Sequence, residues 1–121
     1  MSNKKDVEKF IEEFITIAKV FDIIIINRQE NTEALLDLGI TAVIRKEIIL
    51  SLKAEDYYRG PSEDKDLPGF DMWEFGKIIN DCDEVYIKLS TRREKQSCLC
   101  ISFHRAKFRI TYPFKIQSRK E

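Results

Sequence analysis

The segment EVYIKLSTRREKQSCLCISFHR, residues 84–105, contains two runs of alternating apolar and polar side chains, separated by a charged turn. Side chains on a β-strand point alternately to opposite faces of the sheet, and short polar turns join antiparallel strands. The segment therefore predicts a hairpin with strands over 84–90 and 96–105. One face of this hairpin is apolar and suited to packing against helices, and the other face is polar.

The polar face carries Tyr86, Lys88 and His104, the one histidine of the chain. The expected apolar face consists of Val85, Ile87, Leu89, Leu99, Ile101 and Phe103. A tight turn also predicts the register, with the facing pairs Ser90 and Gln96, Tyr86 and Cys100, and Lys88 and Cys98. His104 then lies opposite Cys82 in the preceding turn, beyond Tyr86 and past the end of the first strand.

Helical periodicity marks the N-terminal part of the chain. Residues 4–21 have apolar side chains at steps of three and four, namely Val7, Phe10, Ile11, Phe14, Ile17, Ala18 and Phe21. This spacing predicts an amphipathic helix. The β-branched run over 22–27 predicts a short buried strand.

Two shorter helices are expected next. Asn31 as N-cap and Gly39 as the C-terminal stop predict a helix over 32–38. Thr41 then caps a helix over 42–52, whose expected buried residues are Val43, Ile44, Ile48 and Leu52.

The middle of the chain is expected to separate a helical half from a strand half. Residues 54–59 read as a last helical turn, and 60–70, with two prolines and two glycines, reads as a loop. A strand over 72–79 follows, and 112–114 could add an edge strand limited by its proline. The order α-β-α-α-β-β-β predicts an α+β fold, with helices on one face of a small, mainly antiparallel sheet, in a single domain over 1–121.

Composition limits the class of protein. The 121 residues are 43% hydrophobic and 35% charged, which is typical of a soluble domain with a charged surface, and we expect a cytoplasmic location. Three cysteines cannot form a complete disulfide framework. Cys98 and Cys100 could supply half of a metal site, but the chain offers no second pair, so buried free thiols are favoured.

The neutral net charge hides a strong asymmetry. From residue 85 to the end the chain has ten Lys or Arg against two acidic residues, whereas the preceding part has eleven against nineteen. A basic third can attract phosphates locally, although lysines also occur on solvated sheet edges as protection against aggregation. The candidate RNA-binding residues are Trp73, Arg92, Arg93, Arg105 and Lys107. Trp73 could equally be a core residue.

The residue types on and near the polar face suit RNA cleavage without a metal. Such an enzyme deprotonates a ribose 2′-hydroxyl, stabilises a charged phosphorane and protonates a 5′-oxygen. His104 can act as base or acid. Arg59 and Lys88 can hold the developing charge, Glu74 can act as base or orient a cation, and Tyr86 can donate to phosphate or stack on a base. Each of these residues is also common on an ordinary exposed sheet face.

The segment 35–103 resembles the MqsR family of bacterial type II toxins, which are mRNA endoribonucleases with a RelE-like fold. The resemblance is carried by LLDLGIT, the helix end IILSL, the run DYYR, a Trp followed by an acid, VYIK, and ISF followed by a polar residue. It implies the catalytic set Arg59, Glu74, Tyr86, Lys88 and His104. Glu74 and His104 depart from the glutamine and lysine common in the family, which leaves the acid and base roles open.

The resemblance also implies partners: an mRNA substrate that is either free or on the ribosome, and a cognate antitoxin that neutralises the toxin. It implies cleavage without a metal or other cofactor. The alternative is a non-catalytic RNA- or protein-binding module on the same scaffold. A hydrolase or metal enzyme of a common class is disfavoured, because the sequence contains no GxSxG, HExxH or glycine-rich phosphate motif.

Overall fold

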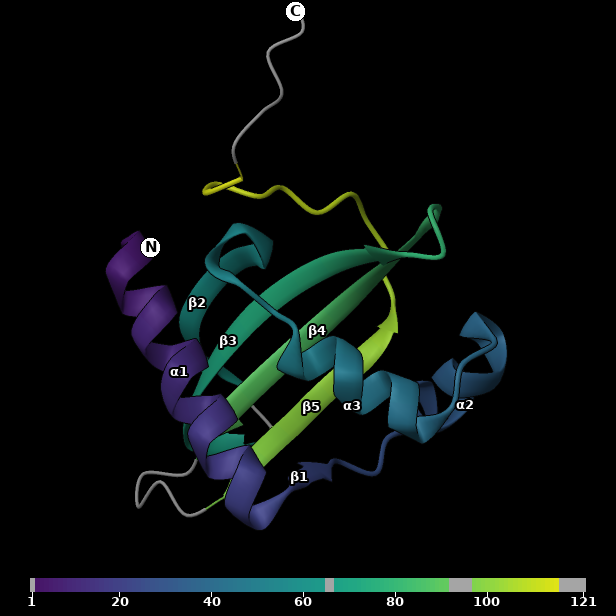
Figure 1. The fold of residues 1–121 in the computed structure, drawn as a ribbon, viewed down its shortest axis with the longest axis horizontal. Helices are drawn as coiled ribbons and strands as arrows, with labels where there is room; N and C mark the ends of the chain where they lie inside the picture. Colours follow the sequence, from purple (N-terminus) through teal and green to yellow (C-terminus); the bar gives the residue numbers. More distant parts are fainter. Residues whose placement is uncertain (1, 65–66, 92–96, 116–121) are drawn as a thin grey trace, which may run out of the picture.

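The computed structural model describes residues 2–64, 67–91 and 97–115, which form an α+β fold (Figure 1). The helices in these residues are α1 (Lys4–Phe21), α2 (Gln29–Leu38), α3 (Ala42–Leu50) and the short 3-10 helix η1 (Ala54–Asp56). The strands are β1 (Ile23–Ile25), β2 (Tyr57–Asp64), β3 (Leu67–Ile79), β4 (Asp83–Thr91) and β5 (Cys98–Arg105). They form one mixed sheet in the order β1-β5-β4-β3-β2, in which β1 is parallel to β5 and the other neighbours are antiparallel.

One strand more is present than the sequence predicts. Strand β2 occupies residues expected to form a helical turn and a loop, and β3 begins at Leu67 rather than at Met72. Glycine, proline and charge in this stretch are compatible with β2 because it is an edge strand, where a proline breaks no ladder. Its pairing with β3 is irregular between Arg59 and Ser62, which leaves Gly60 and Pro61 outside the ladder.

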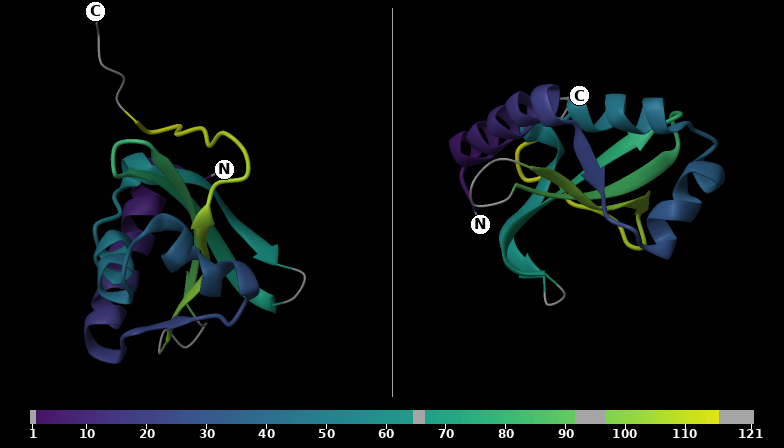
Figure 2. Two further views of the ribbon diagram at one scale, coloured as in Figure 1. Left: turned by 90° about the vertical axis from the view of Figure 1, so that its right-hand side faces the viewer. Right: turned by 90° about the horizontal axis from the view of Figure 1, so that it is seen from below.

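Helices α1 and α3 cover one face of the sheet, as Figures 1 and 2 show. Helix α1 has the predicted limits, because the side chain of Asn3 accepts a hydrogen bond from the backbone N–H of Asp6 at 2.8 Å. Phe10 and Phe14 of α1 are buried in the main core with Phe75 of β3, and β4 and β5 supply further members. The prediction of helices packed on a sheet face is thereby confirmed for these two helices.

Helix α3 follows the predicted cap but not the predicted burial. The Thr41 side chain accepts a hydrogen bond from the N–H of Ile44, as expected of an N-cap. Val43 and Ile44, however, are 66% and 40% exposed, and Ile49 is the residue of α3 that is buried. The helix is only nine residues long, so few of its side chains reach the core. Leu52 is also buried, but it lies after the end of the helix.

The register of β4 and β5 also differs from the prediction. Tyr86 faces His104 and Lys88 faces Ser102, so His104 does not lie beyond Tyr86. Strand β5 begins at Cys98 rather than at residue 96, so the connection after Thr91 is longer than the predicted turn, and the register also shifts after Lys88. The predicted partner Gln96 lies outside the described residues.

The register shift changes which side chains of β5 face the helices. Ile101 is the extra residue, because Leu89 pairs with Cys100 and Lys88 pairs with Ser102. Cys98, Cys100 and Phe103 therefore join the main core, whereas Leu99 and Ile101 form a small cluster with Met72 on the opposite face. The prediction that Leu99 and Ile101 face the helices was wrong.

The cysteines are free, and Cys98 and Cys100 are completely buried, as predicted. Burial raises the pKa of the Cys98 thiol to about 11 and that of Cys100 to about 12. None of the described helices is long and apolar enough to cross a lipid bilayer. Residues 112–114 do not form the expected edge strand.

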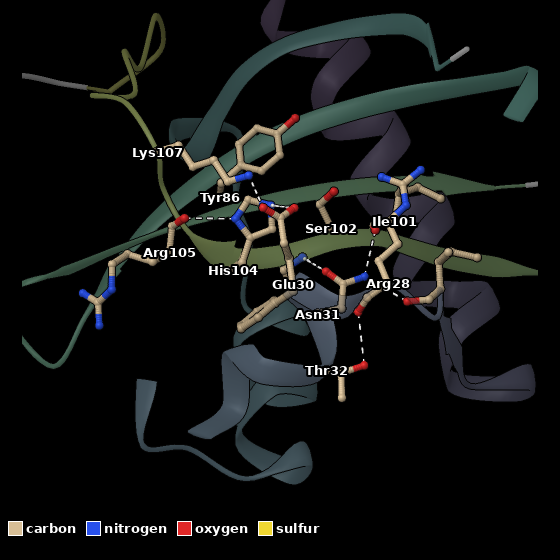
Figure 3. A network of polar contacts seen from close by, with 12 residues as sticks. Arg28, Glu30, Asn31, Thr32, Tyr86, Ile101, Ser102, His104, Arg105 and Lys107 are labelled. Carbon is tan, nitrogen blue, oxygen red and sulfur yellow. Dashed lines mark hydrogen bonds and ion pairs between the residues drawn. The ribbon is translucent and has the colours of Figure 1, made fainter. Parts of the chain in front are cut away.

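Helix α2 lies along the edge of β5, beyond the short strand β1 (Figure 1). Gly39, with φ 69°, ends α2 as expected, but the helix begins at Gln29, so Asn31 is not its N-cap. The buried side chain of Asn31 instead donates to the carbonyl oxygens of Ile26 and Ile101 and accepts from the N–H of Phe103, each at 2.9 Å (Figure 3). It satisfies the backbone of β5 where β1 no longer pairs with it.

Replacing Asn31 by alanine should lower the free energy of unfolding by about 3 kcal/mol, since buried backbone groups lose their partners. Urea denaturation followed by circular dichroism measures this change. Asn27→Ala is the matched control, because Asn27 is exposed and its side chain makes no hydrogen bond to the described residues. Equal effects of the two substitutions would contradict the assigned role of Asn31.

Candidate functional site

Polar side chains from four adjacent strands form a row on the sheet face opposite α1 and α3. The strand register places Arg59 of β2 against Glu74 of β3, Glu74 against Lys88 of β4, and Lys88 against Ser102 of β5. Tyr86 and His104 form the neighbouring row. Alternation along the strands gives all of these side chains the same face, because the residues between them, such as Phe75 and Ile87, lie in the main core.

Glu74 connects its own row, which includes Arg59, Lys88 and Ser102, to the neighbouring row of Tyr86 and His104. Its side chain is almost completely buried, at 3% exposure, and both carboxylate oxygens accept hydrogen bonds. Oε2 accepts from Nε of Arg59 at 2.9 Å, and Oε1 accepts from the hydroxyl of Tyr86 at 2.5 Å. Buried carboxylates are stable only when they are paired and hydrogen-bonded in this way. Glu74 therefore orients both Arg59 and Tyr86.

These contacts determine the charge states of the two partners. The hydrogen bond to Glu74 raises the pKa of Arg59 above its ordinary value and keeps the guanidinium charged. Burial, followed by the hydrogen bond to Glu74, raises the pKa of Tyr86 well above its usual range. Tyr86 is consequently a neutral hydroxyl at physiological pH, and its proton points toward the carboxylate.

His104 lies beside Tyr86 and is held by the backbone and by α2. The two ring centroids are 5.4 Å apart, and the histidine side chain is 14% exposed. Its Nδ1 lies 2.9 Å from the carbonyl oxygen of Arg105, which can only accept, so Nδ1 carries a proton. Nε2 lies 3.6 Å from the carboxylate of Glu30, the neighbour of Asn31 on α2 (Figure 3).

The Glu30 carboxylate lies beside two side chains. Besides His104, it forms an ion pair with Lys107, which follows β5 in the chain. The hydrogen bond from Lys107 is the main cause that lowers the pKa of Glu30, and the charge of His104 adds to it.

Of the predicted RNA-binding residues that the structure describes, Trp73 does not lie on this face, and Arg105 and Lys107 are paired with carboxylates. Trp73 points toward the helices, where its ring stacks on Phe10 with the centroids 4.7 Å apart. Arg105 is paired with Asp37 and Asp83, and Lys107 is paired with Glu30. Arg92 and Arg93 lie outside the described residues. The local positive potential of this region is therefore partly neutralised within the chain.

Sequence reasoning missed three residues that lie at the site. Glu30 comes from a distant helix and has no sequence signal. Tyr58 and Phe108 have rings 5.7 Å apart, and the Phe108 ring is 6.1 Å from that of Tyr86. Tyr58 could have been suspected from its position beside Arg59, but Phe108 belongs to a segment that no motif covers.

No other feature of the described residues competes with this face as a site of chemistry. One cavity of about 460 Å³ lies beside Phe10 and Trp73 and includes none of the five catalytic candidates. Within residues 2–64, 67–91 and 97–115, no three His, Cys, Asp or Glu side chains are placed to hold a metal ion. The face can instead offer a guanidinium, an ammonium, an imidazole and a phenol to an anionic ligand.

Replacing Tyr86 by phenylalanine should lower the free energy of unfolding by about 1–3 kcal/mol at neutral pH, since Glu74 loses a buried hydrogen bond. The substitution should also change the alkaline limb of the stability curve. In the folded protein the pKa of Tyr86 is raised, so its stabilising contribution is present below pH ~10 and is lost as the pH rises above the unfolded value of about 10.

Urea denaturation between pH 7 and 11 tests both effects, and Tyr86→Phe should show a shallower decline above pH ~10 than the unsubstituted protein. Tyr58→Phe is the control, because the Tyr58 hydroxyl has no hydrogen bond to the described residues. The pKa of Tyr112 is also raised, by burial first, so some alkaline decline should remain in both variants. Identical alkaline slopes for Tyr86→Phe and the unsubstituted protein would refute the assignment.

Comparisons with known proteins add no family to this geometry. No family model, curated protein or solved structure matches the chain. The α+β class and the clustering of the five candidates therefore come from the structure, whereas the MqsR-like activity stays a prediction from the sequence.

Proposed function

We propose that this protein is an mRNA endoribonuclease that works without a metal ion, as the toxin of a type II toxin-antitoxin system with a RelE-like fold. The observation that carries the proposal is the convergence of Arg59, Glu74, Tyr86, Lys88 and His104 on one sheet face. These residues come from four strands, and two hydrogen bonds to Glu74 join three of them, Arg59, Glu74 and Tyr86, into one unit. The MqsR-like spacing of the sequence supports the same reading.

The proposed reaction is attack of a ribose 2′-hydroxyl on the adjacent phosphorus. The 2′-oxygen–phosphorus bond forms as the bond from phosphorus to the 5′-oxygen breaks, which leaves a 2′,3′-cyclic phosphate and a 5′-hydroxyl. The 2′-hydroxyl must lose a proton, and the leaving 5′-oxygen must gain one. Negative charge develops on the phosphate oxygens between these two events.

Arg59 and Lys88 are the groups proposed to hold this charge. The Arg59 side chain is 60% exposed, so its outer nitrogens can reach a phosphate while Nε remains bonded to Glu74. A planar guanidinium suits phosphate oxygens because it offers parallel donors. Lys88 lies between Glu74 and Ser102 in the same row and is half-buried, which strengthens its interaction with an anion.

The hydrogen bonds support a division of the proton transfers. The Tyr86 hydroxyl can take the 2′-proton while its own proton passes to Glu74 across the 2.5 Å hydrogen bond. Tyr86 then ends neutral and Glu74 ends protonated. As the imidazolium, His104 can give the proton on Nε2, the nitrogen on the Glu30 side, to the leaving 5′-oxygen and end as a neutral ring with its remaining proton on Nδ1.

The second candidate is a non-catalytic RNA- or protein-binding module. It is favoured by the internal pairing of the site, since a network of Arg59, Glu74 and Tyr86 can also serve only to stabilise the sheet. Arg105 and Lys107 are also paired with carboxylates, which is consistent with a structural rather than a catalytic role for these charges. Such a module would bind RNA without turnover, with an affinity that falls as salt rises.

Purified protein should cleave single-stranded mRNA in the presence of EDTA and leave 2′,3′-cyclic phosphate ends. His104→Ala and Lys88→Met should each reduce the cleavage rate by about 100-fold or more, the usual range for a lost proton-transfer or electrostatic group. A fluorescent oligonucleotide separated on a denaturing gel measures the rates. A single 2′-deoxy nucleotide at the cleavage position should block cutting there.

Lys19→Met is the control for Lys88→Met, because Lys19 is exposed on α1, far from the row. Urea midpoints of all variants separate loss of activity from loss of folding. The catalytic assignment is wrong if His104→Ala and Tyr86→Phe both cut RNA at the unsubstituted rate. If the protein binds RNA but never cuts it, the result supports the non-catalytic binding module.

Induced expression in a bacterial host should arrest growth if the protein is a toxin. His104→Ala, at an equal protein level, should abolish the arrest because the mRNA would no longer be cut. Coexpression of a small protein encoded next to this one should restore growth, as expected of a cognate antitoxin. Optical density and immunoblotting measure both effects. Arrest by His104→Ala as strong as that by the unsubstituted protein would exclude cleavage as the cause.

A further inference from the structure

After β5 the segment 106–115 turns back beside the polar face, where Phe108, Ile110 and Tyr112 lie near Gly76 and Tyr86, before Phe114 packs against the main core. Its backbone begins with a hydrogen bond from the N–H of Ala106 to the carbonyl oxygen of Glu84, at 2.8 Å. The Glu84 carboxylate then accepts from the Tyr112 hydroxyl at 2.7 Å and from the N–H of Ile110 at 3.4 Å. Both ends of the return are therefore anchored to the start of β4.

Gly76 makes this close approach possible. A Cβ at position 76 would lie 2.6 Å from the Tyr112 hydroxyl oxygen and 2.7 Å from Cδ1 of Ile110, so no larger residue fits without displacement. Ile110 is buried there, at 3% exposure. Because Gly76 pairs with Tyr86, the anchored segment runs directly beside the second row of the site.

Phe108 stands between these anchors but is not buried with them. Its side chain is 47% exposed, although the neighbouring Ile110 is almost completely covered. The ring lies 5.7 Å from Tyr58 and 6.1 Å from Tyr86, measured between centroids. The guanidinium of Arg59 lies over the ring of Tyr58, with its central carbon 4.9 Å from the ring centroid.

This arrangement has the components of a nucleobase-binding site. Aromatic rings and arginine planes bind bases by stacking, which needs no particular base edge. An exposed ring held by a fixed backbone loses little conformational freedom when a base stacks on it. Arg59 also extends from this cluster toward Glu74, so one residue belongs both to the aromatic cluster and to the phosphate-binding row.

We propose that Phe108, with Tyr58 and Arg59, forms a stacking subsite for a base of single-stranded RNA. The inference rests on the proposed function, because the subsite would hold the nucleotide next to the phosphate bound by Arg59 and Lys88. The segment 106–115 would then contribute to RNA binding, because it holds Phe108 beside the polar face of the sheet. Binding by stacking should favour purines over pyrimidines, since their rings are larger.

Binding of fluorescent oligodeoxyadenylate of eight nucleotides tests the subsite, since DNA lacks the 2′-hydroxyl and cannot be cut. Phe108→Leu should weaken binding about 10-fold, whereas Phe108→Trp should retain it. An eight-nucleotide abasic strand with the same phosphates is the second probe. Phe108→Leu should leave its binding unchanged, because that strand has charge but no bases. Fluorescence anisotropy at fixed salt measures all affinities.

Phe21→Leu is the matched control, because Phe21 is also an exposed phenylalanine, at 60%, but ends α1. Urea midpoints should show that Phe108→Leu is folded. The subsite is refuted if Phe108→Leu binds oligodeoxyadenylate like the unsubstituted protein, if it weakens both strands equally, or if the unsubstituted protein binds neither strand. Stacking that depends on Phe108 without any RNA cleavage would keep the subsite and reject the endoribonuclease.

Discussion

The side-chain amide of Asn31 is the interaction on which the polar edge of this sheet depends. Strand β1 pairs with β5 only as far as Cys100, which would leave the next part of β5 as an open edge. Asn31 takes over this pairing with three hydrogen bonds to backbone groups. Because an open edge exposes unpaired donors and acceptors, the amide both protects β5 and fixes α2 beside it. The adjacent Glu30 is thereby held against His104.

A buried carboxylate has the corresponding role in the middle of the sheet. Glu74 can remain buried because Arg59 and Tyr86 satisfy its two oxygens. In return it sets the orientation of the Arg59 guanidinium and, after burial, is the second cause that raises the pKa of the Tyr86 phenol. The site is built on strands, and strands hold side chains more precisely than loops do.

Much of the fold could be predicted from periodicity. The limits of α1, the caps at Gly39 and Thr41 and the alternation along β4 are local patterns, and the structure contains all of them. Strand β2 could not be recognised, because an edge strand tolerates the glycine, proline and charge that usually mark a loop. The predicted register of β5 was also wrong, because neither the length of the connection after Thr91 nor the extra residue at Ile101 leaves a mark in the sequence.

The sequence by itself determined which side chains were available and which strand face would carry Tyr86 and Lys88, because alternation along one strand is a local property. Only the tertiary structure decided that His104 lies opposite Tyr86, that Glu74 joins Tyr86 to Arg59, and that Trp73 belongs to the core. It alone brought Glu30 and Phe108 to the site. These contacts join residues far apart in the chain, and they depend on strand register and helix docking, which are set by burial and hydrogen bonding across the whole domain.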